Sequence, residues 1–265
     1  MNLQLSYPNR QQVLVVGYPR SGNTHLARLL GDILNAPVTG AYNATPLAQE
    51  GLDRNGPYVV RQLHLRPLQC EVDGPALRTG WCFCENLWKD ERIVQILRDP
   101  RDIAVSAFHY WERPSINDTL KSMISGLHPL KACGPWSKYI DAWIDVSERS
   151  PLHSITTAFY EDLINAPAEA LTRVLTHLNI EGISHEDIER AIERQSFSAK
   201  RKQVELDGNE RPYGSTIQLK HMRKGIIGDW RNHFTRLDCE LAAANWQAQL
   251  QRFRYEPDVS WINSI

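Results

Sequence analysis

The sequence predicts one α/β domain in which a central parallel sheet lies between layers of helices. Short apolar runs that suit buried strands alternate with segments whose apolar residues recur at helical spacing. Strands joined through helices run parallel with right-handed crossovers and are covered on both faces. The 265 residues are 42 % hydrophobic and 23 % charged, as in an ordinary globular protein. We therefore expect a single domain over residues 1–265.

The first half of the chain supplies three strands and two helices. Val13–Gly17 predicts the first strand, because a continuous apolar run suits a strand buried on both faces. Tyr58–Arg61 and Ile93–Leu97 predict the second and third strands. Asp99 and Pro100 then open a helix that runs to about Tyr110. The helix between the first two strands begins near Thr24, whose hydroxyl can cap it, and its apolar face is Leu26, Leu29, Leu30, Ile33 and Leu34.

The second half supplies four more helices and one strand. Trp136–Ser147 predicts a helix, and a strand follows at Ser154–Tyr160. The next helix starts near Pro167, with its apolar side formed by Leu171, Val174, Leu175 and Leu178. The last two are expected at about Glu186–Arg194 and Leu237–Phe253. Residues 112–135 and 198–225 look irregular, and we expect both to be mobile cover loops.

Charge and targeting signals exclude several classes of protein. The chain carries 30 Lys+Arg against 31 Asp+Glu, which argues against a nucleic-acid partner or a polybasic membrane anchor. It lacks a signal-peptide pattern and a run of ~18–20 apolar residues, so we expect a cytoplasmic protein without a membrane partner. The cysteines have no metal-binding spacing and are expected to be reduced thiols, with no metal: Cys70, Cys82, Cys84, Cys133 and Cys239.

A glycine-rich turn follows the first strand, where open parallel sheets bind their ligands. Gly17 and Gly22 have Gly-x4-Gly spacing directly before a helix, so backbone N–H groups can cradle an anion. A Walker loop for nucleoside triphosphates would continue with Lys and a magnesium-binding hydroxyl. Here Asn23 and Thr24 follow, and the cation Arg20 lies inside the loop. The turn therefore predicts a P-loop-like phosphate site that lacks the complete set of residues for binding a nucleoside triphosphate with magnesium.

Two further motifs place cations and a hydroxyl near the same edge of the sheet. Arg98 follows the third strand, and Ser106 lies on the next helix, so both could converge on a phosphate. Farther along, residues 223–235 read RKGIIGDWRNHFT. Nine basic and four acidic side chains fall within residues 200–236, so the nearly neutral chain has a local basic segment suited to a small polyanion.

These three motifs resemble those of the sulfotransferase family, in the same order and over roughly residues 13–240. YPRSGNTHLARLL is similar to the 5′-phosphosulfate loop of cytosolic-type and bacterial-like small-molecule members, with Arg20 at the loop lysine and His25 where a tryptophan often stacks on adenine. The Arg98–Ser106 segment resembles the 3′-phosphate motif. Residues 223–235 resemble the RKGxxGDWKNxFT signature. The resemblance implies a P-loop-like fold and an enzyme dependent on 3′-phosphoadenosine 5′-phosphosulfate (PAPS), with adenosine 3′,5′-bisphosphate (PAP) as its product and no metal.

The resemblance also implies which residues bind this donor. Tyr160 lies in a YEDL segment, and Phe197 follows Ser196, as in the family's two adenine contacts. The donor-binding residues that we expect are Arg20, Ser21, Gly22, Asn23, Thr24, His25, Arg98, Ser106, Tyr160, Phe197, Arg223, Lys224 and Gly225.

His64 is the first candidate for the catalytic base that removes the acceptor proton. It lies in QLHLR, which is partly similar to the family's KTHLP, with Gln62 and Leu63 in place of Lys and Thr. His109 is the second candidate, and both His109 and Tyr110 are expected near the acceptor. Arg20 is expected to stabilise charge on the leaving group electrostatically, because its guanidinium holds its proton too tightly to act as a general acid.

The acceptor is expected to be a small molecule with a hydroxyl or amine, which the sequence does not identify further. Residues 231–240 partly match the family's dimer motif, with Arg236 in place of a valine, so a homodimer is an open alternative to a monomer. Two other functions stay open from the residues alone. One is a P-loop nucleotide kinase or NTPase, and the other is a catalytically degenerate phosphoadenosine-binding protein.

Overall fold

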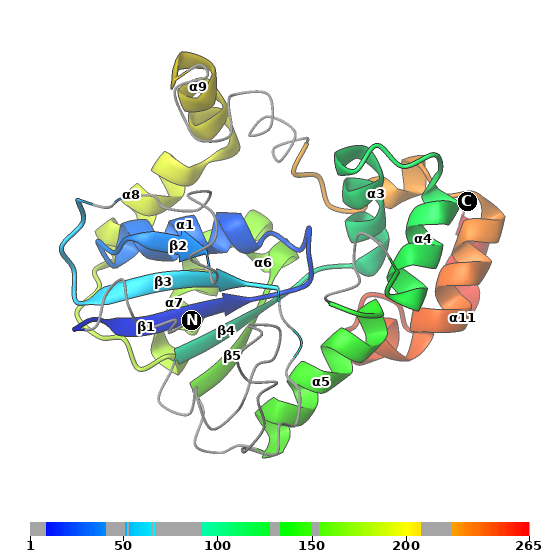
Figure 1. The fold of residues 1–265 in the computed structure, drawn as a ribbon, viewed down its shortest axis with the longest axis horizontal. Coiled ribbons are helices and arrows are strands. Elements are labelled where there is room, and N and C mark those ends of the chain that lie inside the picture. Colours follow the sequence, from blue (N-terminus) through cyan, green and yellow to red (C-terminus); the bar gives the residue numbers. More distant parts are fainter. Residues whose placement is uncertain are drawn as a thin grey trace, which may run out of the picture.

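A parallel sheet of five strands forms the centre of the molecule (Figure 1). The computed structural model describes residues 9–40, 51, 53–64, 66, 92–127, 133–149, 154–207 and 224–264. Within them, the strands lie in the order β2-β3-β1-β4-β5. Their bounds are β1 (Gln11–Val16), β2 (Val38–Gly40), β3 (Tyr58–Leu63), β4 (Arg92–Leu97) and β5 (Ser154–Phe159). The predicted α/β fold is confirmed.

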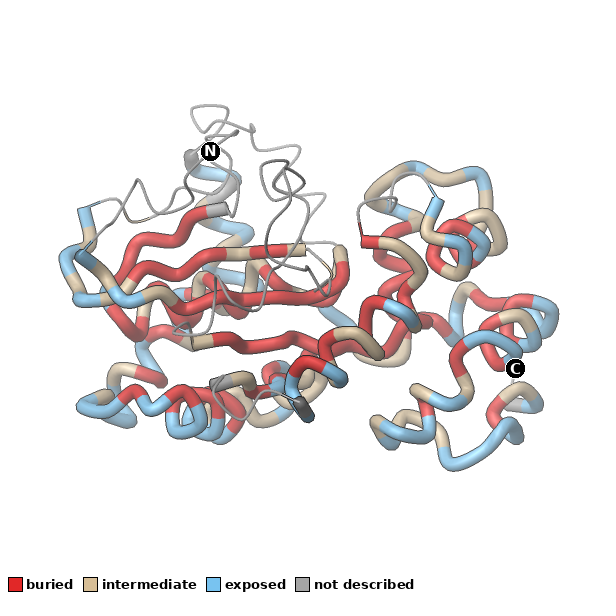
Figure 2. The backbone as a smooth tube through the Cα atoms, turned by 60° about the horizontal axis from the view of Figure 1, so that its bottom comes forward, coloured by how far each residue is buried: buried red, intermediate tan, exposed pale blue. Residues whose placement is uncertain are grey.

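Side-chain alternation along β1 divides the core into two parts. Val13 and Val15 pack in a cluster with α1 (Asn23–Ile33), α7 (Pro167–His177) and α8 (His185–Gln195). Leu14 and Val16 point to the opposite face and pack in a second cluster. Figure 2 shows that the strands are buried along most of their length. The apolar run in the sequence is therefore a central strand covered on both faces.

The second core cluster contains a group of helices near the carboxyl ends of the strands (Figure 1). These helices are α3 (Pro100–Tyr110), α4 (Ile116–Ser125), α5 (Trp136–Arg149) and α11 (Arg236–Arg252). The remaining helical segments of the described residues are α6 (Tyr160–Asn165), α9 (Phe197–Asp207) and the 3-10 helices η3 (Asp229–Asn232) and η4 (Val259–Ser264). α9 extends from α8 away from the sheet.

The structure corrects several expectations about local structure. α4 lies inside residues 112–135 and α9 begins the 198–225 segment, so neither stretch is irregular throughout. β2 is an additional short strand, and Tyr160 begins α6 instead of ending β5. Thr24 does not cap α1: Gly22 takes the N-cap position, with no side-chain capping bond. By contrast, Asp99 caps α3 as expected, because its side chain accepts from the N–H of Arg101.

The described residues can also be searched for membrane-spanning helices, metal sites and the state of the cysteines. Among the described residues, no helix combines the length and apolar character needed to cross a membrane. The same residues contain no group of three or more His, Cys, Asp or Glu side chains suited to a metal ion. Cys133 and Cys239 are buried free thiols, whereas Cys70, Cys82 and Cys84 lie outside the described residues.

Candidate active site

The turn between β1 and α1 is tightly curved at the carboxyl end of the central strand. Arg20 has a φ of 74° and Gly22 a φ of 102°, so two residues of the turn adopt the left-handed region. The N–H of Ser21 donates to the carbonyl of Tyr18 at 3.1 Å, and Nδ2 of Asn23 donates to the same carbonyl at 2.9 Å. These bonds stabilise a compact loop at the N-terminus of α1, where the helix dipole favours an anion.

The two glycines of the loop are required by close packing. A Cβ on Gly17 would lie 2.4 Å from Oδ1 of Asn23 and 2.5 Å from the side chain of Ile96. A Cβ on Gly22 would lie 2.6 Å from the ring of Tyr160. Gly22 also has a backbone conformation that L side chains rarely adopt. The Gly-x4-Gly spacing therefore brings the loop against β4 and α6.

The loop is joined to the second motif through two arginines. Nε of Arg20 donates to Oγ of Ser106 at 3.1 Å, and Nη1 of Arg98 donates to the carbonyl oxygen of Arg20 at 3.1 Å. The Arg20 guanidinium also lies 4.2 Å from the centre of the Tyr110 ring. The two segments therefore form one cationic site, and Tyr110 borders it.

Arg98 is a buried cation with unused hydrogen-bonding capacity. It is only 8 % exposed, and its guanidinium lies 4.3 Å from the centre of the Tyr160 ring. Its buried Nε has no hydrogen-bond partner among the described residues. A buried donor without a partner is costly, so the residue is suited to an anionic ligand.

The third motif reaches the same site from the C-terminal part of the chain. Gly225 has a φ of 67°, and a Cβ placed on it would lie 3.7 Å from both Cδ2 of Phe197 and the hydroxyl of Tyr160. Phe197 is 39 % exposed, so its ring is available for contact with a flat ligand. Nζ of Lys224 lies 3.4 Å from Oδ1 of Asp229. Arg223, the other predicted phosphate ligand of this motif, lies outside the described residues.

Asp102 connects the third motif to α3, a role that the sequence analysis missed. Its carboxylate accepts from the N–H of Gly228 at 2.7 Å and from the N–H of Trp230 at 3.0 Å. The pKa of Asp102 is raised, mainly by burial and next by the negative charge of Asp99. The charge of Arg98 and the two backbone hydrogen bonds lower this pKa and offset part of the effect. The sequence shows that Asp102 is an acidic residue in the first turn of α3. It does not show that the residue pairs with backbone groups 126 and 128 positions farther along the chain.

His64 lies directly after β3, beside the turn between β1 and α1. Its Nδ1 is 2.8 Å from the carbonyl oxygen of Gly17, and its Nε2 is 3.3 Å from Nε2 of Gln62. Burial lowers the pKa of His64; the bond to Gly17 opposes this effect, and the charge of Arg20 adds to it. The neutral ring therefore carries its proton on Nδ1, where the carbonyl can only accept, and has a lone pair on Nε2.

The remaining predicted site residues occupy different environments. His25 is half-buried in the first turn of α1, and burial lowers its pKa to about 4. Ser21 and Asn23 are buried in the loop. His109 is exposed on α3, with its ring centre 5.2 Å from that of His233. The structure thus associates His64 with the loop and His109 with the segment before α11, and the choice between them as the base stays a prediction.

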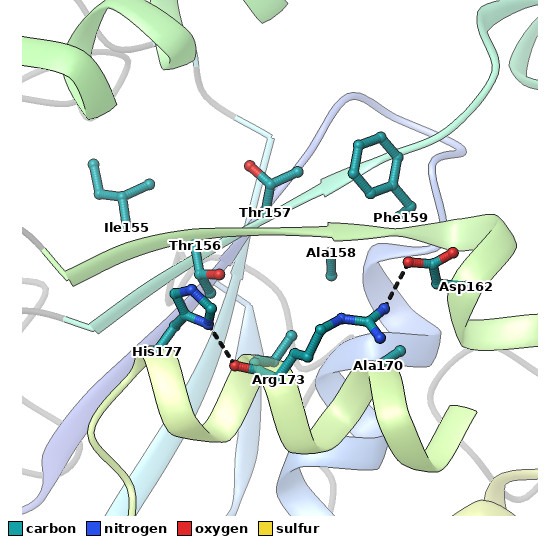
Figure 3. A pocket seen from close by; sticks show the side chains of 10 residues that line it. Ile155, Thr156, Thr157, Ala158, Phe159, Asp162, Ala170, Arg173 and His177 are labelled. Carbon is teal, nitrogen blue, oxygen red and sulfur yellow. Dashed lines mark hydrogen bonds and ion pairs between the residues drawn. The ribbon is translucent and has the colours of Figure 1, made fainter. Parts of the chain in front are cut away.

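A separate pocket of about 390 Å³ lies between β5 and α7 (Figure 3). Arg173 and Asp162 form an ion pair of 2.7 Å within it, and Nδ1 of His177 lies 2.8 Å from the carbonyl oxygen of Arg173. None of the predicted site residues lines this pocket. We therefore do not assign it to the candidate active site.

The described geometry is that of an α/β protein with a P-loop-like fold, in which residues of three distant motifs lie together near the carboxyl ends of the central strands. A family model for the sulfotransferase domain matches residues 10–254. The chain therefore belongs to the sulfotransferase family.

Individual relatives are distant but extend over most of the chain. Mouse sulfotransferase 1B1 is 24 % identical over 259 residues, covering 90 % of this chain and 82 % of the relative. Rat sulfotransferase 1E1 is 24 % identical over 268 residues, covering 92 % and 86 %.

Solved structures show the same fold. Mouse sulfotransferase SULT7A1 complexed with PAP superposes with a TM-score of 0.61 at 21 % identity, covering 89 % of this chain and 84 % of that one. Retinol dehydratase in complex with androsterone and PAP gives a TM-score of 0.63 at 18 % identity, covering 90 % and 80 %. At these identities the structural likeness concerns the fold.

Proposed function

We propose that the protein transfers a sulfuryl group from PAPS to a hydroxyl or amine of a small-molecule acceptor. The observation that carries the proposal is the contact of Arg20 with Ser106 and of Arg98 with the Arg20 backbone. This contact unites the phosphate loop with the motif that resembles a 3′-phosphate site. A ligand with phosphate groups at both the 5′ and 3′ positions explains why both motifs are present.

The residues present fit such a donor. The loop offers N–H groups at the start of α1, and Arg98 contributes a buried Nε without a partner among the described residues. We assign the 5′-phosphate side to Arg20–His25, and the adenine to Tyr160 and Phe197, with His25 at the family's usual stacking position. The 3′-phosphate is assigned to Arg98, Ser106, Arg223, Lys224 and Gly225. When bound, PAPS supplies the sulfuryl group and leaves as PAP.

The chain's own residues supply a base and a positive charge. We assign His64 as the base: the carbonyl of Gly17 holds the proton on Nδ1, so Nε2 can accept a proton from the acceptor's O–H or N–H. The reserve assignment is His109. Arg20 is assigned to stabilise negative charge that develops on the donor side, where a preorganised cation acts without moving a proton.

The nature of the acceptor is supported by relatives. Retinol dehydratase has been crystallised with androsterone and with retinol, both together with PAP. We propose a small organic acceptor for this chain as well, bordered by Tyr110, which lies over Arg20, and by His109. A cytoplasmic location and a homodimer stay predictions. In the segment that partly matches the dimer motif, Arg236 is exposed and pairs with Glu240 at 3.1 Å.

The experiment that tests the function combines ligand binding with turnover. Thermal unfolding is measured with PAP and, separately, with ADP plus magnesium. We expect PAP to stabilise the folded protein, by ~2.7 kcal/mol at a hundredfold excess over Kd, and ADP plus magnesium not to do so. Formation of PAP from PAPS is then followed with a panel of phenols, alcohols and amines, with and without EDTA. Acceptor-dependent turnover that is insensitive to EDTA is the expected result.

Other outcomes would point to other functions. Comparable stabilisation by ADP plus magnesium would support a P-loop kinase or NTPase. PAP binding without turnover on any acceptor would support a degenerate binding protein. His64→Ala separates the two base assignments, because full activity in a folded variant would move the base to His109.

A further inference from the structure

Gln62 and His64 share one side of the chain at the end of β3, because alternate residues of an extended strand point the same way. The intervening Leu63 is buried on the other side. Oγ1 of Thr24, in the first turn of α1, donates to Oε1 of Gln62 at 3.1 Å. Nε2 of Gln62 in turn lies 3.3 Å from Nε2 of His64. A hydrogen-bonded chain thus runs from the phosphate loop to the ring of His64.

The direction of each bond follows from the donors and acceptors available. The carbonyl of Gly17 can only accept, so Nδ1 of His64 donates to it. A neutral imidazole has one proton, so Nε2 carries a lone pair and accepts from the amide nitrogen of Gln62. With the amide nitrogen of Gln62 facing His64, its Oε1 accepts from the Thr24 hydroxyl at 3.1 Å. All three bonds are compatible with one arrangement of protons.

The amide of Gln62 therefore donates a hydrogen bond to Nε2 of His64, the atom that must accept the proton in the proposed reaction. An acceptor hydroxyl or amine would have to donate to the same lone pair, so the amide must move aside first. The backbone of His64 is held independently, because the Sγ–H of Cys133 meets its carbonyl oxygen at 3.1 Å. The adjustable part of this arrangement is the contact of the ring with Gln62.

We propose that Gln62 is a positioning residue that couples the availability of His64 to occupation of the phosphate loop, an inference that rests on the proposed function of that loop. In the donor-free protein, Gln62 holds Nε2 of His64 and is itself held by Thr24. An anion in the loop attracts the Thr24 hydroxyl, because a charged acceptor forms a stronger hydrogen bond than an amide oxygen. Gln62 then loses its anchor and releases Nε2 to the acceptor.

Nitrogen-15 NMR of histidine-labelled protein tests this coupling, with the His64 signals assigned from a His64→Asn variant. Gln62→Met keeps a similar length but cannot donate, so the Nε2 signal of His64 is expected to move downfield in the ligand-free protein. Saturation with PAP is expected to move the wild-type signal in the same direction. In Gln62→Met, PAP should produce a much smaller change.

Two further variants keep the test decisive. Thr24→Val removes the anchor, so Nε2 should move downfield without ligand. Gln62→Glu replaces the donor by a carboxylate and should draw a proton onto Nε2, which gives a doubly protonated ring and an opposite shift. It provides a second reading if Gln62→Met does not fold. The matched control is Gln11→Met, at the opposite end of the sheet, where Oε1 accepts from Arg92 at 2.6 Å.

The failure of this inference differs from the failure of the proposed function. Calorimetry that shows no binding of PAP to the wild-type protein would contradict the proposed function, while the ligand-free spectra would still test the Gln62–His64 bond. Binding of PAP with equal shifts of Nε2 in wild type and Gln62→Met would overturn the coupling alone. An unchanged Nε2 signal in both ligand-free Gln62 variants would overturn it as well.

Discussion

Nε of Arg20 donates to Oγ of Ser106 at 3.1 Å, which joins a left-handed residue of the β1–α1 turn to the middle of α3. The two residues are 86 positions apart in the chain. Because Ser106 is buried and Arg98 holds the carbonyl oxygen of Arg20, both the backbone and the side chain of this arginine are restrained. A cation that is held in place in this way can stabilise charge in a transition state without having to move during the reaction.

Arg20→Ala is expected to reduce kcat about 100- to 1000-fold, the usual cost of removing one preorganised donor at a site of developing charge. The dissociation constant of PAP should change much less, because the loop N–H groups and Arg98 remain. Arg20→Lys should recover part of the activity, since it keeps the charge but not the bond from Nε. Steady-state kinetics and calorimetry measure the two quantities.

The control for this prediction is Arg173→Ala. Arg173 is exposed on α7 and paired with Asp162, away from the loop residues. Its kinetic constants should match those of the wild type. Unchanged turnover in Arg20→Ala would remove Arg20 from the chemical step.

Arg98→Met is expected to lower the affinity for PAP about 10- to 100-fold, because a hydrogen bond to a charged group is worth about 1.5–3 kcal/mol. The affinity for adenosine 5′-monophosphate, which has no 3′-phosphate, should fall far less. The ratio of the two dissociation constants, measured by calorimetry, is therefore the informative quantity. Equal losses for both nucleotides would give Arg98 a structural role only.

The main elements of the fold could be predicted because their signals are local. The apolar run of β1, the helical spacing in α1 and the Asp99 cap of α3 each depend on a few neighbouring residues. α4 was missed although its end signals are present: Ser115 accepts from the N–H of Asp118, and Gly126 ends the helix at a φ of 66°. The prolines and glycines around it hid these signals. β2 is too short to show a periodic pattern.

Part of the grouping of the candidate residues could also be predicted. The glycine spacing and the cations singled out the β1–α1 turn, Arg98 and Ser106, and the structure brings Arg98 and Ser106 into contact with Arg20 because they lie at a strand end and on the adjacent helix. The roles of Asp102 and Gln62 depend on partners that only the folded chain brings near, such as the N–H of Gly228 or the hydroxyl of Thr24. No local pattern reports such a pairing.

Asp102→Asn is expected to lower the free energy of unfolding by about 1–3 kcal/mol, because the amide has one acceptor oxygen for the two backbone N–H groups of Gly228 and Trp230. The 224–230 segment should then be held less firmly, and PAP should bind more weakly than to the wild type. Urea unfolding and calorimetry measure both effects. The control is Asp187→Asn, which weakens the cap of α8 and should leave PAP affinity unchanged.

A loss of stability without any loss of PAP affinity would contradict the positioning role of Asp102. It would show that the two bonds to Gly228 and Trp230 support the fold but do not place Lys224 and Gly225.

His25 is expected to make the protein sensitive to mild acid. Burial, aided by the charge of Arg28, lowers its pKa from 6.5 to about 4 in the folded state. Below pH 6.5 the unfolded chain therefore takes up a proton that the folded protein does not accept until about pH 4. Stability falls as the pH decreases through this window, by roughly 2 kcal/mol between pH 7 and pH 5 from this residue alone.

Urea unfolding of wild type and His25→Gln at the two pH values measures this contribution. The variant should lose less stability on acidification, because glutamine takes up no proton in this range. The difference between the two proteins isolates His25 from His64, whose pKa is also lowered and which is present in both. His177→Gln, on the surface of α7, should behave like the wild type. An equal acid loss in wild type and His25→Gln would show that His25 is protonated as readily in the folded protein as in the unfolded chain.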